Sequence, residues 1–562
     1  MTEPRPSEPA AAPSPRDAPK PEGTPDHART AGRGGLAVLG AKVFFIATGL
    51  LQQTLLPLAI GQADYGALAL VLAPTNVLNN VVVSSSTQGV SRTVAGAGVS
   101  EREALRATLR VHLVIALLAA IVLALGAPIY AWYQNRPALL APLLAMTGVL
   151  FIYGLYAPLV GYLNGRGLFT RQASLDVLAA TLRTIAFLGV GYLFATRGGA
   201  IASALGTSGG LLGATVGAVL AAVGVVSLAL RWTGAGKAFG ASRPAGVPTA
   251  RTYLALIVPI MVAQLFTNGL MQADIILLGH YISAPAAIAA ETAARAARDM
   301  NDVAPAAATA RSADEWVAVY RACQLFAFLP YQMLFSVTQV LFPMVARARA
   351  EEGIGERVAA LVRRGCRIGA IVCGLLVVVV LAMPGSLLKL AYGSGVAMRG
   401  ASTLSLLALG QAAFAILGLS TTVLVSLGRE RAAMTITAVA LALLAGTCAV
   451  VIPLAPFGEK QLLATAAATT TALVCALVVG VITVRKIAGA FVPWKTAVRV
   501  GLCIGGAYLL GGVMPMFSKL LTPVVAAGVG IAYLVALVVT GEIGKDDLAL
   551  VVSIAARRGA KR

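Results

Sequence analysis

Long apolar runs separated by short polar stretches fill the chain from about residue 35 onward. A helix of about 20 mainly apolar residues is long enough to cross the roughly 30 Å hydrocarbon core of a bilayer. The pattern therefore predicts an all-α polytopic membrane protein with about fourteen transmembrane helices. The predicted spans lie at roughly 35–60, 65–91, 111–131, 138–163, 173–195, 208–230, 253–280, 316–345, 367–390, 400–427, 432–453, 461–484, 497–515 and 522–540.

The composition supports a membrane protein and argues against a nucleic-acid-binding one. The chain has 562 residues, of which 58% are hydrophobic and 12% are charged, and its formal net charge is +21. Soluble globular domains carry about 25% charged residues. The 44 basic residues recur in short stretches between apolar runs instead of clustering on a soluble domain. This distribution is typical of cytoplasmic loops.

The placement of basic residues predicts the orientation. An even number of spans puts both termini on the same side of the membrane. The stretches that share this side hold 32 of the 44 Lys and Arg residues, whereas the opposite loops hold 10. Because basic loops stay in the cytosol, both termini are predicted to be cytoplasmic.

A short repeat suggests two halves with the same orientation. "TQGVSRTVA" (87–95) closes the second predicted span and "TQVLFPMVA" (338–346) closes the eighth, and six helices separate them. This spacing predicts a parallel repeat of spans 1–6 and 7–12. The expected organisation is a disordered cytoplasmic tail (1–34), an N-terminal lobe (35–231), a cytoplasmic linker (232–252), a C-terminal lobe (253–484), two further helices (485–540) and a cytoplasmic amphipathic tail (541–562).

Several motifs carry a resemblance to a known family. They are "IGQADYGALAL" (60–70), "GVSRTVA" (89–95), "ADIILLG" (273–279), "FLPYQMLFSVTQVLFPMVAR" (328–347) and "LVSLGRERAAM" (424–434). In this order and spacing, the sequence resembles the polysaccharide-biosynthesis flippases of the multidrug/oligosaccharidyl-lipid/polysaccharide (MOP) exporter superfamily. Two features depart from the family pattern. An Ala- and charge-rich insertion, about 282–315, reads as a spacer, and an arginine often found just before residues 60–66 is missing.

The resemblance implies a fold, a substrate and a location. It implies two six-helix lobes around a central cavity that opens alternately to each side, with two extra C-terminal helices. The expected substrate is a polyprenyl-diphosphate-linked glycan, presented within membrane lipid in the bacterial inner membrane. Other polysaccharide-assembly proteins are further expected partners. No bond is made or broken in such transport, so the chain is not expected to be an enzyme.

Polar side chains inside the predicted spans are the candidates for lining that cavity. Exposing polar groups to hydrocarbon is costly, so they should face protein or water. They concentrate on spans 1, 2, 7 and 8, which are matching helices of the two halves, and Pro330 permits a bend in span 8. Interhelical hydrogen bonding without transport is the alternative explanation. The candidates are Lys42, Gln53, Asn76, Asn80, Gln264, Asn268, Gln324, Gln332 and Gln339.

Charged residues form a second set, predicted to gate the cavity or contact the substrate. Arg92 and Arg347 flank the expected inner mouth, although the positive-inside rule alone also explains them. Asp176 and Arg183 are seven residues apart on one stripe of span 5, where a structural ion pair with a neighbouring span and a substrate contact are equally compatible with the pattern. Asp274, near the outer end of span 7, is a candidate for pairing with a cation, for gating, or for carrying a coupling H⁺ or Na⁺.

No other chemistry is predicted from the sequence. The six cysteines lie in or beside apolar runs without a CxxC pair, and the three histidines lack metal-ligand spacing. No cofactor or metal is expected, and coupling to H⁺ or Na⁺ stays open. The alternatives are a lipid II flippase, a cation-coupled multidrug exporter of the same superfamily, and a membrane glycosyltransferase, which would need a large outer loop rich in convergent polar residues.

Overall fold

The computed structural model describes residues 25–95, 101–234, 249–285, 288–289, 292–293 and 306–544. Within these ranges the chain is helical and contains no strand. The predicted all-α fold class is therefore confirmed. Twelve helices of the described part are long and apolar enough to cross a membrane. The predicted number of fourteen is not established, because α1 contributes only a shorter apolar segment, Phe44–Ile60, and the eighth predicted span is divided between two helices.

The first group of helices comprises the N-terminal lobe. α1 begins within the predicted tail, so residues 25–34 are helical, and the rest of that tail lies outside the described residues. The helices are α1 (Pro25–Ile60), α2 (Gln62–Ala95), α3 (Glu101–Tyr133), the short 3-10 helix η2 (Pro137–Leu139), α4 (Leu140–Gly165), α5 (Phe169–Arg197), α6 (Gly199–Ala204) and α7 (Gly209–Thr233).

The second group comprises the C-terminal lobe and two appended helices. The lobe contains α8 (Ala250–Ile282), α10 (Ala306–Ala327), α11 (Leu329–Glu352), α12 (Glu356–Ala382), α13 (Pro384–Tyr392), α14 (Ser394–Ser426), α15 (Glu430–Val451) and α16 (Glu459–Ala488), followed by α17 (Trp494–Val513) and α18 (Leu521–Val539).

The break between α10 and α11 falls where the sequence predicts a bend. α10 ends at Ala327, and Pro330 lies in the first turn of α11. Proline is favoured there because the backbone N–H groups of the first helical turn have no acceptor within the helix, so the N–H that proline lacks is not missed. Part of the insertion that the sequence analysis interprets as a spacer is helical, since residues 306–315 form the start of α10.

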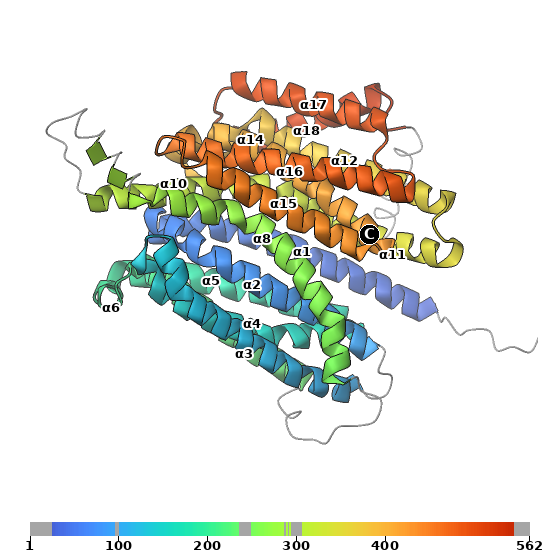
Figure 1. Cartoon of the computed structure of the whole chain (residues 1–562), viewed down its shortest axis with the longest axis horizontal. Coiled ribbons are helices and arrows are strands. Elements are labelled where there is room, and N and C mark those ends of the chain that lie inside the picture. Colours follow the sequence, from blue (N-terminus) through green and yellow to red (C-terminus); the bar gives the residue numbers. More distant parts are fainter. Residues whose placement is uncertain are drawn as a thin grey trace, which may run out of the picture.

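The two groups meet at α8, which belongs to the second group and also packs against the first. Figure 1 shows α2 to α5 together on one side and α12 to α18 on the other, with α8 running obliquely between them. α8 packs against α2 over much of its length and also against α15. Below, "inner" denotes the side predicted to be cytoplasmic and "outer" the opposite side.

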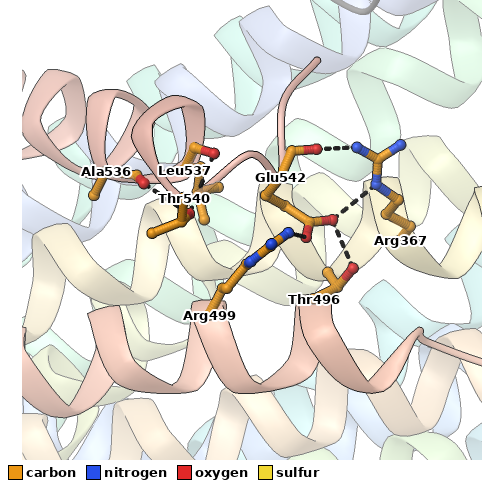
Figure 2. A network of polar contacts seen from close by, with 7 residues as sticks. All are labelled: Arg367, Thr496, Arg499, Ala536, Leu537, Thr540 and Glu542. Atoms are coloured by element: carbon orange, nitrogen blue, oxygen red, sulfur yellow. Dashed lines mark hydrogen bonds and ion pairs between the residues drawn. The ribbon is translucent and has the colours of Figure 1, made fainter.

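A buried carboxylate attaches the last two helices to the C-terminal lobe. Glu542, which follows α18, is 4% exposed and accepts hydrogen bonds from Arg367 Nε on α12 (2.8 Å), and from Thr496 Oγ1 (2.6 Å) and Arg499 Nη1 (2.7 Å) on α17. Figure 2 shows these contacts converging on one side chain. The cluster therefore joins α12, α17 and the end of α18. The predicted amphipathic tail beyond residue 544 lies outside the described residues.

Candidate functional site between the lobes

One face of α2 is polar and open, although the helix lies inside the bundle. Its exposed residues include Asn80, Gln88 and Arg92, whereas none of its large apolar side chains is exposed. The helices on the periphery behave in the opposite way, and Leu125 of α3 is 69% exposed and Ile185 of α5 is 63% exposed. Because exposed amides are costly in hydrocarbon, we infer that this face of α2 borders a hydrated interior.

Two predicted amides meet at the middle of this face, one from each lobe. Asn80 Nδ2 on α2 donates to Asn268 Oδ1 on α8 at 2.8 Å. Asn268 in turn donates to the backbone oxygen of Gln264 at 2.8 Å and to its side-chain Oε1 at 3.2 Å. Asn76 is half-buried one turn before Asn80. The structure therefore links three predicted residues, Asn80, Asn268 and Gln264, at the α2–α8 contact, with Asn76 one turn away on α2.

Gln53 lies at a second contact between α1 and α2. The hydroxyl of Tyr65 donates to Gln53 Oε1 at 2.9 Å, and the ring of Tyr65 packs 6.3 Å from the ring of Tyr392 on α13. Tyr65 is 2% exposed. Gln53 is thus held by a buried tyrosine that also touches the C-terminal lobe.

Asp274 and Gln324 lie inside the C-terminal lobe, away from the open face. Asp274 is 1% exposed and accepts hydrogen bonds from Tyr320 Oη (2.8 Å), Gln324 Nε2 (3.0 Å) and the backbone N–H of Ile275 (2.8 Å). Gln324 is fully buried and also accepts from Arg321 at 3.1 Å. In this conformation Gln324 fixes the carboxylate of Asp274 and does not line an open space.

The outer side is closed by contacts that the sequence did not reveal. Arg136, which follows α3, forms an ion pair with Asp314 of α10, and its Nε donates to Ser283 Oγ at 2.9 Å. Gln134 Nε2 donates to the backbone oxygen of Ile276 at 3.0 Å. We call the residues Gln134, Arg136, Ser283 and Asp314 the outer seal. The sequence analysis gave gating of the outer side as one possible role of Asp274. In the structure, the outer seal makes the contacts that close this side.

Aromatic stacking and a close approach of two helices lie beside the outer seal. The ring of Tyr133 stacks on His280 with centroids 4.0 Å apart. Gly66 of α2 lies so close to α10 that a Cβ atom there would be 1.8 Å from the backbone oxygen of Asp314. Only glycine permits this approach, which brings the two lobes into direct contact.

At the inner side, α8 is attached to the N-terminal lobe along a narrow line. Tyr253 and Ile257 are buried against α2 and α3, while Leu254, Leu256 and Val258 between and beside them are exposed. The hydroxyl of Tyr253 lies 2.6 Å from His112 Nε2, and His112 Nδ1 lies 3.0 Å from Ser86 Oγ. We call Ser86, His112 and Tyr253 the inner latch.

Removing the Tyr253 hydroxyl should loosen the inner latch. Tyr253→Phe leaves His112 Nε2 buried without its partner, which should cost about 1–3 kcal/mol. In a background without native cysteines, we expect faster maleimide labelling of Ile257→Cys when Tyr253→Phe is also present. Tyr508→Phe, at a half-exposed position on α17, should leave the labelling rate unchanged. Equal labelling in all three proteins would show that the latch hydrogen bond does not hold α8.

The remaining predicted residues are not gathered at one point. Arg92 and Arg347 are exposed on α2 and α11, and Gln332 is half-buried near the start of α11. Arg183 and Asp176 both lie on α5, and the guanidinium of Arg183 stacks over the ring of Phe45 at 4.8 Å. Lys42 and Gln339 lie in α1 and α11, but their side chains are outside the described part.

No three His, Cys, Asp or Glu side chains in the described ranges are grouped as metal ligands. The polar groups described above at the lobe interface are amides, hydroxyls, arginine, the carboxylate of Asp314 and the imidazoles of His112 and His280. Such groups can bind and orient a polar or anionic molecule without carrying out covalent chemistry.

Comparisons with known proteins identify the fold. No protein-family model matches the chain, and no curated protein sequence matches it. A structure of the lipid II flippase MurJ in an inward closed conformation is similar, with a TM-score of 0.64 and 12% identity over 92% of this chain and 99% of that one. Outward-facing and inward-facing structures of a MATE family multidrug transporter of the MOP superfamily give TM-scores of 0.55 and 0.54, with 14% and 12% identity. The alignment with the outward-facing structure covers 81% of this chain and 96% of the transporter chain. The alignment with the inward-facing structure covers 80% of this chain and 98% of the transporter chain. At these identities the similarity shows a common fold, that of multi-pass MOP transporters.

Proposed function

We propose that this protein, with the fold of the MOP transporters, is a flippase. It moves an oligosaccharide or polysaccharide repeat unit linked to undecaprenyl diphosphate across the bacterial inner membrane by alternating access. The observation that carries the proposal is the polar face of α2, joined to α8 through Asn80 and Asn268 where the two lobes meet. The sequence resemblance supplies the substrate class.

The physical reason is the cost of moving a glycan through hydrocarbon. A polyprenyl chain stays in the bilayer, but each sugar hydroxyl and phosphate would lose its water hydrogen bonds on crossing. The amides of Asn76, Asn80, Gln264 and Asn268 offer replacement donors and acceptors along a path that avoids lipid. The path needs no catalytic group, because no bond changes.

The closed outer side supports alternating access as the mechanism. The outer seal holds Arg136 and Asp314 together across the lobes, so a substrate on the open α2 face has no direct exit outward in this conformation. Breaking the outer seal and forming closer contacts at the inner side would expose the same face to the opposite compartment. Two lobes rocking about a fixed central site would produce this exchange.

Lipid II is the second candidate substrate, favoured by the similarity to MurJ over 92% of the chain. Lipid II also carries a diphosphate on a polyprenyl chain, so the same polar path would serve it. Multidrug export is a weaker candidate, because the MATE structures cover only 81% and 80% of this chain. We further propose that transport is coupled to H⁺ or Na⁺. We assign Asp274 of α8 as the residue that binds the coupling ion, because its carboxylate is buried in the C-terminal lobe.

Proteoliposomes containing the purified protein test the proposal. A fluorescent undecaprenyl-diphosphate oligosaccharide is offered in parallel with labelled lipid II and a cationic dye, and dithionite reports the outer-leaflet fraction. We expect the oligosaccharide lipid to cross fastest. Asn80→Leu and Asn268→Leu should each slow it at least about tenfold, since each removes the hydrogen bond between the two lobes and an amide of the polar path. Thr196→Leu, on an exposed face of α5, is the matched control. Preferential movement of lipid II or of the dye would replace the proposed substrate.

A further inference from the structure

A half-buried arginine inside the N-terminal lobe has no use in the contacts described so far. Arg183 lies near the middle of α5, a helix whose exposed side is apolar. Leu178, Ile185 and Tyr192 form that exposed stripe, with 41%, 63% and 59% of their surfaces accessible. With about 100° of rotation per residue, Arg183 lies about 140–180° away from the stripe. Its side chain therefore points away from lipid and into the lobe.

One aromatic ring stacks on the guanidinium of Arg183, and a second aromatic residue lies near it. The ring of Phe45 on α1 lies 4.8 Å from its Cζ atom, and Tyr153 on α4 is close enough to interact with it electrostatically. Tyr153 also packs edge-to-face on Tyr156 of the same helix, with centroids 5.8 Å apart. Aromatic faces stabilise a cation but leave its N–H donors unused.

One polar atom of this cluster is buried without a hydrogen-bond partner, namely Nε of Arg183. An unused donor on a half-buried cation is costly unless a ligand satisfies it.

Phe45, which stacks on the guanidinium, keeps part of its surface open. It is 41% exposed, yet it lies about 120–140° from Leu51 and Leu58, which mark the exposed apolar stripe of α1. We infer that its open side is turned away from this stripe, so that a ligand between the helices can approach Phe45 and the adjacent guanidinium.

We propose that Arg183, with Phe45, forms a subsite for an oxyanion of the transported lipid, namely its phosphate or diphosphate. The inference rests on the proposed flippase function. A guanidinium presents several N–H donors in a plane that matches phosphate oxygens. Phe45 holds that plane by stacking. The subsite lies in the N-terminal lobe, so the head group would travel with that lobe.

Binding of a charged and an uncharged lipid of the same chain length tests the subsite. The full-length protein in detergent is titrated with undecaprenyl diphosphate and with undecaprenol, followed by native mass spectrometry. The wild-type protein should prefer the diphosphate. Arg183→Gln should weaken diphosphate binding about ten- to a hundredfold and leave undecaprenol binding unchanged. Arg183→Lys should recover part of the preference, and Phe45→Leu should show a smaller loss. Arg197→Gln, an exposed arginine of the same helix, is the matched control.

The outcomes separate the subsite from the function. If Arg183→Gln keeps the full preference for diphosphate, or Arg197→Gln loses it equally, the subsite is wrong and the flippase proposal stands. If the wild-type protein binds neither lipid, both proposals fail. A competition with phosphatidylglycerol distinguishes substrate from bulk lipid, since equal displacement would assign the site to ordinary phospholipid head groups and overturn the inference. Should Arg183→Gln fail to fold, Phe45→Leu and Arg183→Lys still give the comparison.

Discussion

Replacing Gly66 by alanine is expected to hold the outer side of the protein open. The added Cβ would lie 1.8 Å from the backbone oxygen of Asp314 and 3.0 Å from the backbone nitrogen of Ala318, and neither atom can move aside as a flexible side chain would. The helices α2 and α10 must therefore separate, and the outer seal cannot form. Because the proposed alternating access needs both closed states, the proposed lipid transport should fall by at least about tenfold.

Spin labels at the outer ends of the two lobes measure this effect. Trp132 at the end of α3 and Met398 at the start of α14 are 79% and 64% exposed and belong to different lobes. Their distance distribution should shift to longer values in Gly66→Ala. Gly126→Ala, at a position with open space around the added atom, should reproduce the wild-type distribution. An unchanged distribution in Gly66→Ala would mean that the contact of α2 with α10 does not control the outer side.

Glu542→Gln is expected to release the two C-terminal helices from the lobe. The carboxylate accepts from two arginines and a threonine, and an amide keeps only one acceptor oxygen and brings its own N–H donors to Arg367 and Arg499. Because both arginines are about 30% exposed, solvent screens part of the loss. We expect a cost of about 2 kcal/mol. Hydrogen–deuterium exchange of α17 and α18 should rise, whereas Glu430→Gln at an exposed position should have no effect.

The same carboxylate gives a pH dependence with a defined sign. Burial alone would raise the pKa of Glu542, but the hydrogen bonds from Thr496, Arg367 and Arg499 keep that pKa below its ordinary value. The stabilisation is therefore present above the unfolded-state pKa of about 4.3 and is lost as the pH falls through the lower folded-state value. The difference in melting temperature between wild type and Glu542→Gln should be constant from pH 7 to 5 and should shrink below about pH 4. A difference that persists at pH 3 would exclude this origin.

The periodicity of the chain predicted the helices because burial of an apolar run in a bilayer is a local property. The bend at Pro330 followed from the same pattern, because proline interrupts a helix locally. The pattern also selected Asn80 and Asn268 as cavity candidates, since both are polar residues inside apolar spans. It did not predict the hydrogen bond between them, which depends on how α2 packs against α8.

The outer seal was missed because its residues carry no local signal. Arg136 and Asp314 are 178 residues apart, and Asp314 lies in the alanine-rich segment that looked like a spacer. Likewise, the sequence pattern makes Gln324 a cavity-lining candidate together with Gln332. In the structure, Gln324 donates a hydrogen bond to Asp274 and is buried inside the C-terminal lobe. Only packing decides whether a polar side chain in a membrane helix satisfies a neighbour or faces an open interior.

The division of α8 between two partners has a mechanical consequence. The helix packs on α2 of one lobe and on α15 and α10 of the other. On its inner part, Tyr253 and Ile257 are buried against the N-terminal lobe, whereas Leu254, Leu256 and Val258 are exposed. Any relative movement of the two halves must therefore carry α8 along with one of them and break its contact with the other.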